Sequence, residues 1–175
     1  MVRKRESTVS SIRIPTDISQ TIRKDADSSG LSFNALTLKI LTRYTEWDRY
    51  TQKIGFVSMP REMLRAIIDV VDQDALNKIA LGLASSYKES TLLWFKEINV
   101  KTFFEFFRIA SYYSGLIEYD LKSDGKNFTI TLHHQLGERW SKAYQHFAVE
   151  VFKTCLGVDP IVEIGKNHAV IRFAI

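Results

Sequence analysis

The 175-residue sequence has one cysteine, Cys155, so it cannot form an internal disulfide, and a reducing, cytoplasmic location is expected. It has no apolar run near the roughly 20 residues that a membrane-spanning helix needs, so no membrane association is expected. The basic residues 1–8 precede no apolar segment, which argues against a secretory signal. With 45% hydrophobic and 25% charged residues, the composition is that of an ordinary globular protein.

Motifs of the common enzyme and cofactor sites are missing as well. No GxGxxG, HExxH or CxxC occurs, and the stretch IGKNHA lacks the residues that flank the Gly-Lys pair of a P-loop. His133 and His134 are adjacent in a predicted strand and point to opposite faces, so we expect one packed and one solvated rather than a shared metal. Cys155 is expected to be a small buried residue, not a nucleophile. We therefore expect no enzyme activity, no catalytic residue, no metal site and no cofactor.

The net charge is unevenly distributed along the chain. Residues 1–54 hold ten basic and six acidic residues, so they carry all of the formal net charge of +4, and the remaining 121 residues hold fourteen of each kind. A basic segment attached to a neutral body indicates a polyanion-binding module followed by a second module.

The beginning of the chain predicts a short strand. Ile12 and Ile14 fall on one face of residues 9–14 and Ser11 and Arg13 on the other, and Pro15 ends the strand because it has no N–H to donate. A strand of six residues is not a sheet, and the nearest later strand candidates lie in the far tail. We therefore expect this segment of two chains to pair antiparallel.

Two helices are predicted after this strand. The first begins with Thr16 as its N-cap and runs to about Asp27, and Gly30 suits the position that follows its end. Ser32 caps the second, longer helix, whose apolar residues spread around most of its circumference. A helix that is apolar on so many sides is expected to be buried on several of them.

The strand SSIRIP, the helix TDISQTIRKDADSSG and the helix LSFNALTLKILTRYTEW together resemble a ribbon-helix-helix DNA-binding domain over about residues 8–48. The resemblance implies an intertwined dimer whose two-stranded ribbon enters the major groove. It implies that the ribbon reads bases through its outward side chains, here Val9, Ser11 and Arg13. It also implies that the second helix binds a phosphate through the backbone N–H groups of Ser32, Phe33 and Asn34. Ser10 departs from the pattern, because an apolar residue is usual at that inward position.

General physical chemistry agrees with this resemblance. The major groove admits a two-stranded ribbon, and Arg13 can pair with O6 and N7 of guanine. A helix N-terminus has unpaired N–H groups and a partial positive charge that suit a phosphate. The arm of Arg3, Lys4 and Arg5 is expected to contact the DNA backbone. The alternative for residues 9–14 is an edge strand of the tail sheet, with Arg13 solvated.

The rest of the chain predicts a body of α+β class at residues 56–175, after a head at residues 1–53. Residues 54–60 are predicted as a linker or short strand, with Pro60 at the first position of the next helix. Helical stripes follow at residues 64–71 and 76–83, then a short helix at 88–98 and one capped by Asn99. The last sixty residues predict a β-β-α-β-β unit, with an Asp124-Gly125 hairpin and a long helix.

These features predict a cytoplasmic transcriptional regulator, for example a repressor, that binds double-stranded DNA as a homodimer or higher even oligomer. The alternative is an antitoxin-like or other protein-interaction module whose body binds a partner protein while its head autoregulates. A small-molecule effector and a partner protein are both candidates for the body. An enclosed pocket would favour the effector, and a large exposed apolar patch would favour the protein.

Overall fold

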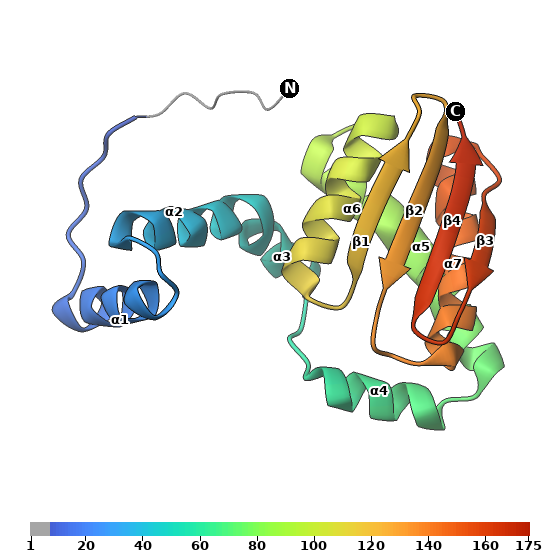
Figure 1. Ribbon diagram of the computed structural model, residues 1–175, viewed down its shortest axis with the longest axis horizontal. Coiled ribbons are helices and arrows are strands. Elements are labelled where there is room, and N and C mark those ends of the chain that lie inside the picture. Colours follow the sequence, from blue (N-terminus) through green and yellow to red (C-terminus); the bar gives the residue numbers. More distant parts are fainter. Residues whose placement is uncertain (1–7) are drawn as a thin grey trace. The chain divides into compact units, whose positions relative to one another are not determined.

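The computed structural model describes residues 8–175 and confirms the α+β class (Figure 1). The chain divides into two compact units, of which we call residues 8–45 the head and residues 46–175 the body. The elements are, in chain order, α1 (Thr16–Ser28), α2 (Phe33–Arg43), the π-helix η1 (Tyr44–Asp48), α3 (Arg49–Ile54), α4 (Arg61–Val70), α5 (Gln73–Phe95), α6 (Val100–Ser114), β1 (Glu118–Ser123), β2 (Asn127–His133), α7 (Glu138–Leu156), β3 (Ile161–Ile164) and β4 (His168–Ala174).

The strand predicted over residues 9–14 is absent from the structure. Residues 8–15 have no regular secondary structure, and the four-stranded sheet contains only β1 to β4. The predicted strand is therefore wrong for the single chain. Residues 9–14 form neither a ribbon strand nor an edge strand of the tail sheet. A strand needs a neighbouring backbone for its hydrogen bonds, and a single chain supplies none to this segment.

The two helices of the head are confirmed, and local signals explain their ends. Pro15, rather than the predicted Thr16, takes the N-cap position of α1. After α1, Gly30 adopts a φ of 65°, and the N–H of Leu31 donates to Ala26 O at 2.9 Å. This left-handed turn after the helix is the conformation for which glycine is favoured.

The burial predicted for the second helix is wrong in the single chain. No residue of α2 is buried, and Leu38 is 65% exposed. The predicted long helix is also interrupted, because η1 separates α2 from α3 and places Trp47 in the core of the body. A π-turn inserts one extra residue per turn and so changes which face of a helix its side chains occupy.

The β-β-α-β-β tail of the body is confirmed. Its antiparallel sheet has the order β1-β2-β4-β3, with Ile130 opposite Ile171 on the central pair of strands. The predicted hairpin between β1 and β2 is closed by Asp124, whose carboxylate accepts from the N–H groups of Lys126 and Asn127. Gly125 has a φ of 96°, which only glycine adopts readily.

Helices cover one face of this sheet (Figure 1). The long helix α7 packs on β3 and β4, α5 packs along α7, and α6 lies beside β1. Phe103, Phe152 and Ile171 are fully buried at the centre of the resulting core. The separate short helix predicted at residues 88–98 is wrong, because α5 continues unbroken from residue 73 to residue 95.

The linker and the helix starts of the body follow their predictions in most respects. Residues 56–60 form no strand, and Pro60 takes the N-cap position of α4 rather than the first helical position. Asn99 caps α6 in a reciprocal arrangement with Thr102. A second apolar cluster forms where α4 meets α5 and α7, around the buried side chains of Ile68 and Leu136.

Candidate nucleic-acid interface

The three predicted base-reading residues lie on the irregular segment before α1. Val9, Ser11 and Arg13 are all exposed, as is Ile12 at 67%, while Ile14 is half-buried. The structure leaves these side chains accessible to a nucleic acid, but the segment is not the predicted ribbon in this single chain.

The N-terminus of α2 has the geometry of an anion site. Ser32 caps the helix, and its Oγ accepts from the N–H of Ala35 at 3.1 Å. Among residues 8–175, no group accepts a hydrogen bond from the N–H of Phe33 or Asn34. Such unpaired N–H groups, together with the helix dipole, attract a negatively charged group.

Arg23 is a charged group at this position that the sequence did not reveal. Its guanidinium lies over the Phe33 ring, 4.6 Å from the ring centroid, and so joins α1 to the start of α2. The contact is a cation–π interaction, which brings a positive charge to the side chain of the first residue of α2. No periodicity identifies Arg23, because the contact depends on how the α1–α2 turn folds back. The predicted arm of Arg3, Lys4 and Arg5 lies outside the described residues.

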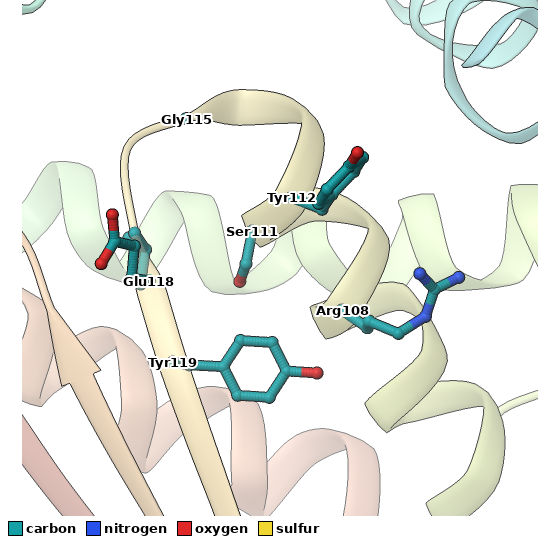
Figure 2. Close-up of a pocket in the computed structure, with 7 residues that line it drawn as sticks. Arg108, Ser111, Tyr112, Gly115, Glu118 and Tyr119 are labelled. Atoms are coloured by element: carbon teal, nitrogen blue, oxygen red, sulfur yellow. The ribbon is translucent and has the colours of Figure 1, made fainter. Parts of the chain in front are cut away.

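The body has a cleft between α6 and β1 whose lining includes charged and aromatic side chains. It has a volume of about 390 Å³, and Figure 2 shows Tyr119 on β1 pointing across it toward α6. Arg108 forms a salt bridge with Glu105 at 2.7 Å and lies 4.0 Å from Glu46. Because two carboxylates already neutralise this guanidinium, the cleft offers little attraction to an anion.

The prediction for the two histidines is confirmed, whereas Cys155, which was predicted to be buried, is half-buried. His134 is buried, with Nε2 2.9 Å from Ser141 Oγ and Nδ1 accepting from the N–H of Leu136, whereas His133 is exposed. Burial raises the pKa of the half-buried Cys155 thiol, which reduces its reactivity at neutral pH. Among the described residues, no group of three potential metal ligands occurs.

Neither protein-family models nor curated protein sequences match this chain. No helix within residues 8–175 is both long and apolar enough to cross a membrane.

Proposed function

We propose that this protein is a dimeric, sequence-specific DNA-binding regulator of transcription of the ribbon-helix-helix kind. We propose no catalytic role for the protein. The observation that supports a DNA-binding dimer is the large number of exposed apolar side chains in the head. Ala26 is the only buried residue among residues 8–45, whereas large apolar side chains are exposed along the whole segment: Val9, Ile12, Ile18, Leu31, Leu38, Ile40, Leu41 and Tyr44.

A second copy of the chain is the partner that best accounts for this exposure. Two copies of residues 9–14 would supply each other with the hydrogen bonds that the single chain cannot make. A two-fold axis also brings the same surface of each copy together, so the exposed apolar faces of α1 and α2 would cover each other. The strand prediction for residues 9–14 then applies to the dimer.

DNA is the ligand that suits the polar side of this arrangement. In a paired ribbon, Val9, Ser11 and Arg13 would share the face opposite Ile12, and Arg13 would read guanine in the major groove. The N–H groups at the start of α2 would bind a backbone phosphate, and Arg23 would add a positive charge there.

The test is selection of binding sites from random duplexes by the full-length protein at a fixed salt concentration. We expect an enriched motif of two half-sites, inverted or in tandem, because a two-fold dimer presents two reading heads. Enrichment of no motif would overturn the proposal.

Arg13→Ala then tests the reader itself. This variant should bind the selected site roughly 5- to 150-fold more weakly, the equivalent of about 1–3 kcal/mol, and discriminate less at one position in each half-site. The matched control is Arg65→Ala, which removes an exposed arginine from α4 of the body. Equal binding by both variants would show that Arg13 does not read bases.

A further inference from the structure

The body contains an apolar cavity that the proposed DNA-binding role does not use. It has a volume of about 290 Å³ and lies among α5, α6 and α7, with Trp47 and Phe56 completing its wall. Eight of its seventeen lining residues are aromatic, and none is charged. A charged ligand would lose its hydration here without gaining a partner, so the lining favours a neutral one.

Trp140 on α7 lines the cavity with its ring and not with its N–H group. Its Nε1 is closed to solvent and has no hydrogen-bond partner among the described residues. A ligand in the open cavity therefore contacts the carbon atoms of this ring. Trp94 is different, because its Nε1 donates to Glu46 O at 2.9 Å.

Tyr144, one turn along α7, is the unpaired polar group of this wall. It is buried and lines the cavity, but its hydroxyl makes no hydrogen bond to any residue from 8 to 175, whereas Tyr87 donates to Phe103 O at 3.0 Å. Burial raises the pKa of Tyr144, so its hydroxyl remains a neutral donor. Four serines also line the cavity, and two of them donate to backbone carbonyls of their own helices: Ser86 and Ser114. A few polar groups in a mainly apolar wall are the usual way in which a pocket orients a small ligand.

The size of the cavity indicates a small molecule. A cavity of about 150 Å³ accepts benzene, so this one has room for roughly two fused rings. A helical peptide would instead need a long groove with several anchor pockets. Phe56, 59% exposed, and Leu83, 44% exposed, mark the side on which the cavity opens to solvent.

We propose that the body binds a neutral, mainly aromatic small molecule of about two rings, which places a hydrogen-bond acceptor against the Tyr144 hydroxyl. The aromatic wall, which includes the Trp140 ring, contacts the rings of the ligand. The site is independent of the head, and its binding is measured without DNA, so its failure and that of the DNA-binding role are distinguishable.

The test uses calorimetric titration of the full-length protein with three probes of similar shape. Naphthalene has no acceptor, quinoline replaces one CH with a ring nitrogen, and 1-naphthoate carries a negative charge. We expect saturable binding of quinoline, roughly three- to tenfold weaker binding of naphthalene, and at least tenfold weaker binding of naphthoate. Tyr144→Phe removes only the hydroxyl, so it should abolish the preference for quinoline over naphthalene while keeping naphthalene binding.

A matched pair of variants tests the position of the site. Leu83→Trp introduces a large ring at the opening and should weaken quinoline binding at least tenfold. Leu81→Trp makes the same change on α5 at a residue outside the lining that is equally exposed, at 43%, and should leave binding unchanged.

Three results would overturn the proposal: no saturable binding of any probe by the folded protein, equal effects of the two tryptophan variants, or naphthoate binding as tight as quinoline binding. A change in sedimentation of the ligand-free protein caused by Leu83→Trp, without probe binding, would instead assign this face to a contact between copies.

Discussion

The head and the body are built from similar amphipathic helices, but only the body covers their apolar faces with its own chain. Among residues 8–175, all buried apolar residues except Ala26 belong to the body, where the sheet, α5, α6 and α7 enclose most of them. In the head, α1 and α2 pack on each other and leave the rest of their apolar surface in solvent. An apolar stripe thus predicts that a face is buried in the functional molecule, but not which chain covers it.

The largest loss of stability should follow from removing a large side chain from the core of the body. Phe103→Ala removes a ring that is fully buried on α6, and should lower the free energy of unfolding by about 3–5 kcal/mol at any protein concentration. Tyr112→Ala, on the same helix but 61% exposed, is the control and should cost less than about 1 kcal/mol. Denaturant unfolding measures both, and similar losses would contradict the assignment of the core.

A charge introduced into the head should weaken the association of two copies and leave the stability of the body unchanged. Leu38→Asp would bury an unpaired carboxylate between two copies, so the dimer dissociation constant should rise at least about a hundredfold, or about 2.7 kcal/mol. Sedimentation equilibrium measures the dissociation constant. Denaturant unfolding should show that the free energy of unfolding of the body is unchanged.

Lys39→Asp is the control for this charge. It places the same acid one position further along α2, about 100° around the helix, at a residue that is already polar and exposed. A wild-type protein that stays monomeric at all concentrations, or equal effects of the two variants, would refute the dimer.

The pH dependence of stability should belong to the body. Burial, and then the charges of His168 and His133, lower the pKa of His134 below its usual 6.5. The unfolded chain then binds the proton more readily, so stability is retained above about pH 6.5 and is lost as the pH falls below it toward the lowered pKa.

His134→Gln should remove this loss, which is at most about 1.4 kcal/mol per pH unit for one group. Unfolding free energies measured from pH 7.5 to 5 test it, with the exposed His146→Gln as the control. An unchanged slope in His134→Gln would mean that His134 does not carry the effect.

The smallest effect is expected at Arg23. Arg23→Ala should weaken DNA binding less than about tenfold on all sequences alike, and should reduce the slope of log affinity against log salt by about one phosphate contact. Lys78→Ala on α5 of the body is the control for the loss of one positive charge. A loss confined to the selected site would instead make Arg23 a reader of sequence.

Local signals predicted a hairpin of the body and helix starts in both the head and the body. The hairpin at Asp124-Gly125 and the caps at Ser32 and Asn99 depend on atoms only two or three residues apart, so the sequence reveals them directly. The break predicted within α5 was wrong because Gly82 and the serines after it weaken a helix without ending one.

Other features could not be predicted, because they depend on contacts between residues far apart in the sequence. Trp47, Phe106 and Trp140 meet at one cavity although almost a hundred residues separate the first from the last. The spacing of each within its own helix is also that of an ordinary core residue. The 9–14 segment shows the opposite case: its alternating pattern is clear, but no neighbouring backbone within residues 8–175 supplies the hydrogen bonds of a strand.

The two outer strands of the sheet affect how the protein behaves in a crowded cell. β1 presents Glu118, Asp120 and Lys122 to solvent, and β3 is only four residues long and carries Glu163. Short or charged edge strands resist pairing with strands of other molecules. The edges of this sheet therefore disfavour pairing between copies, which leaves residues 9–14 as the segment that we propose to pair in the dimer.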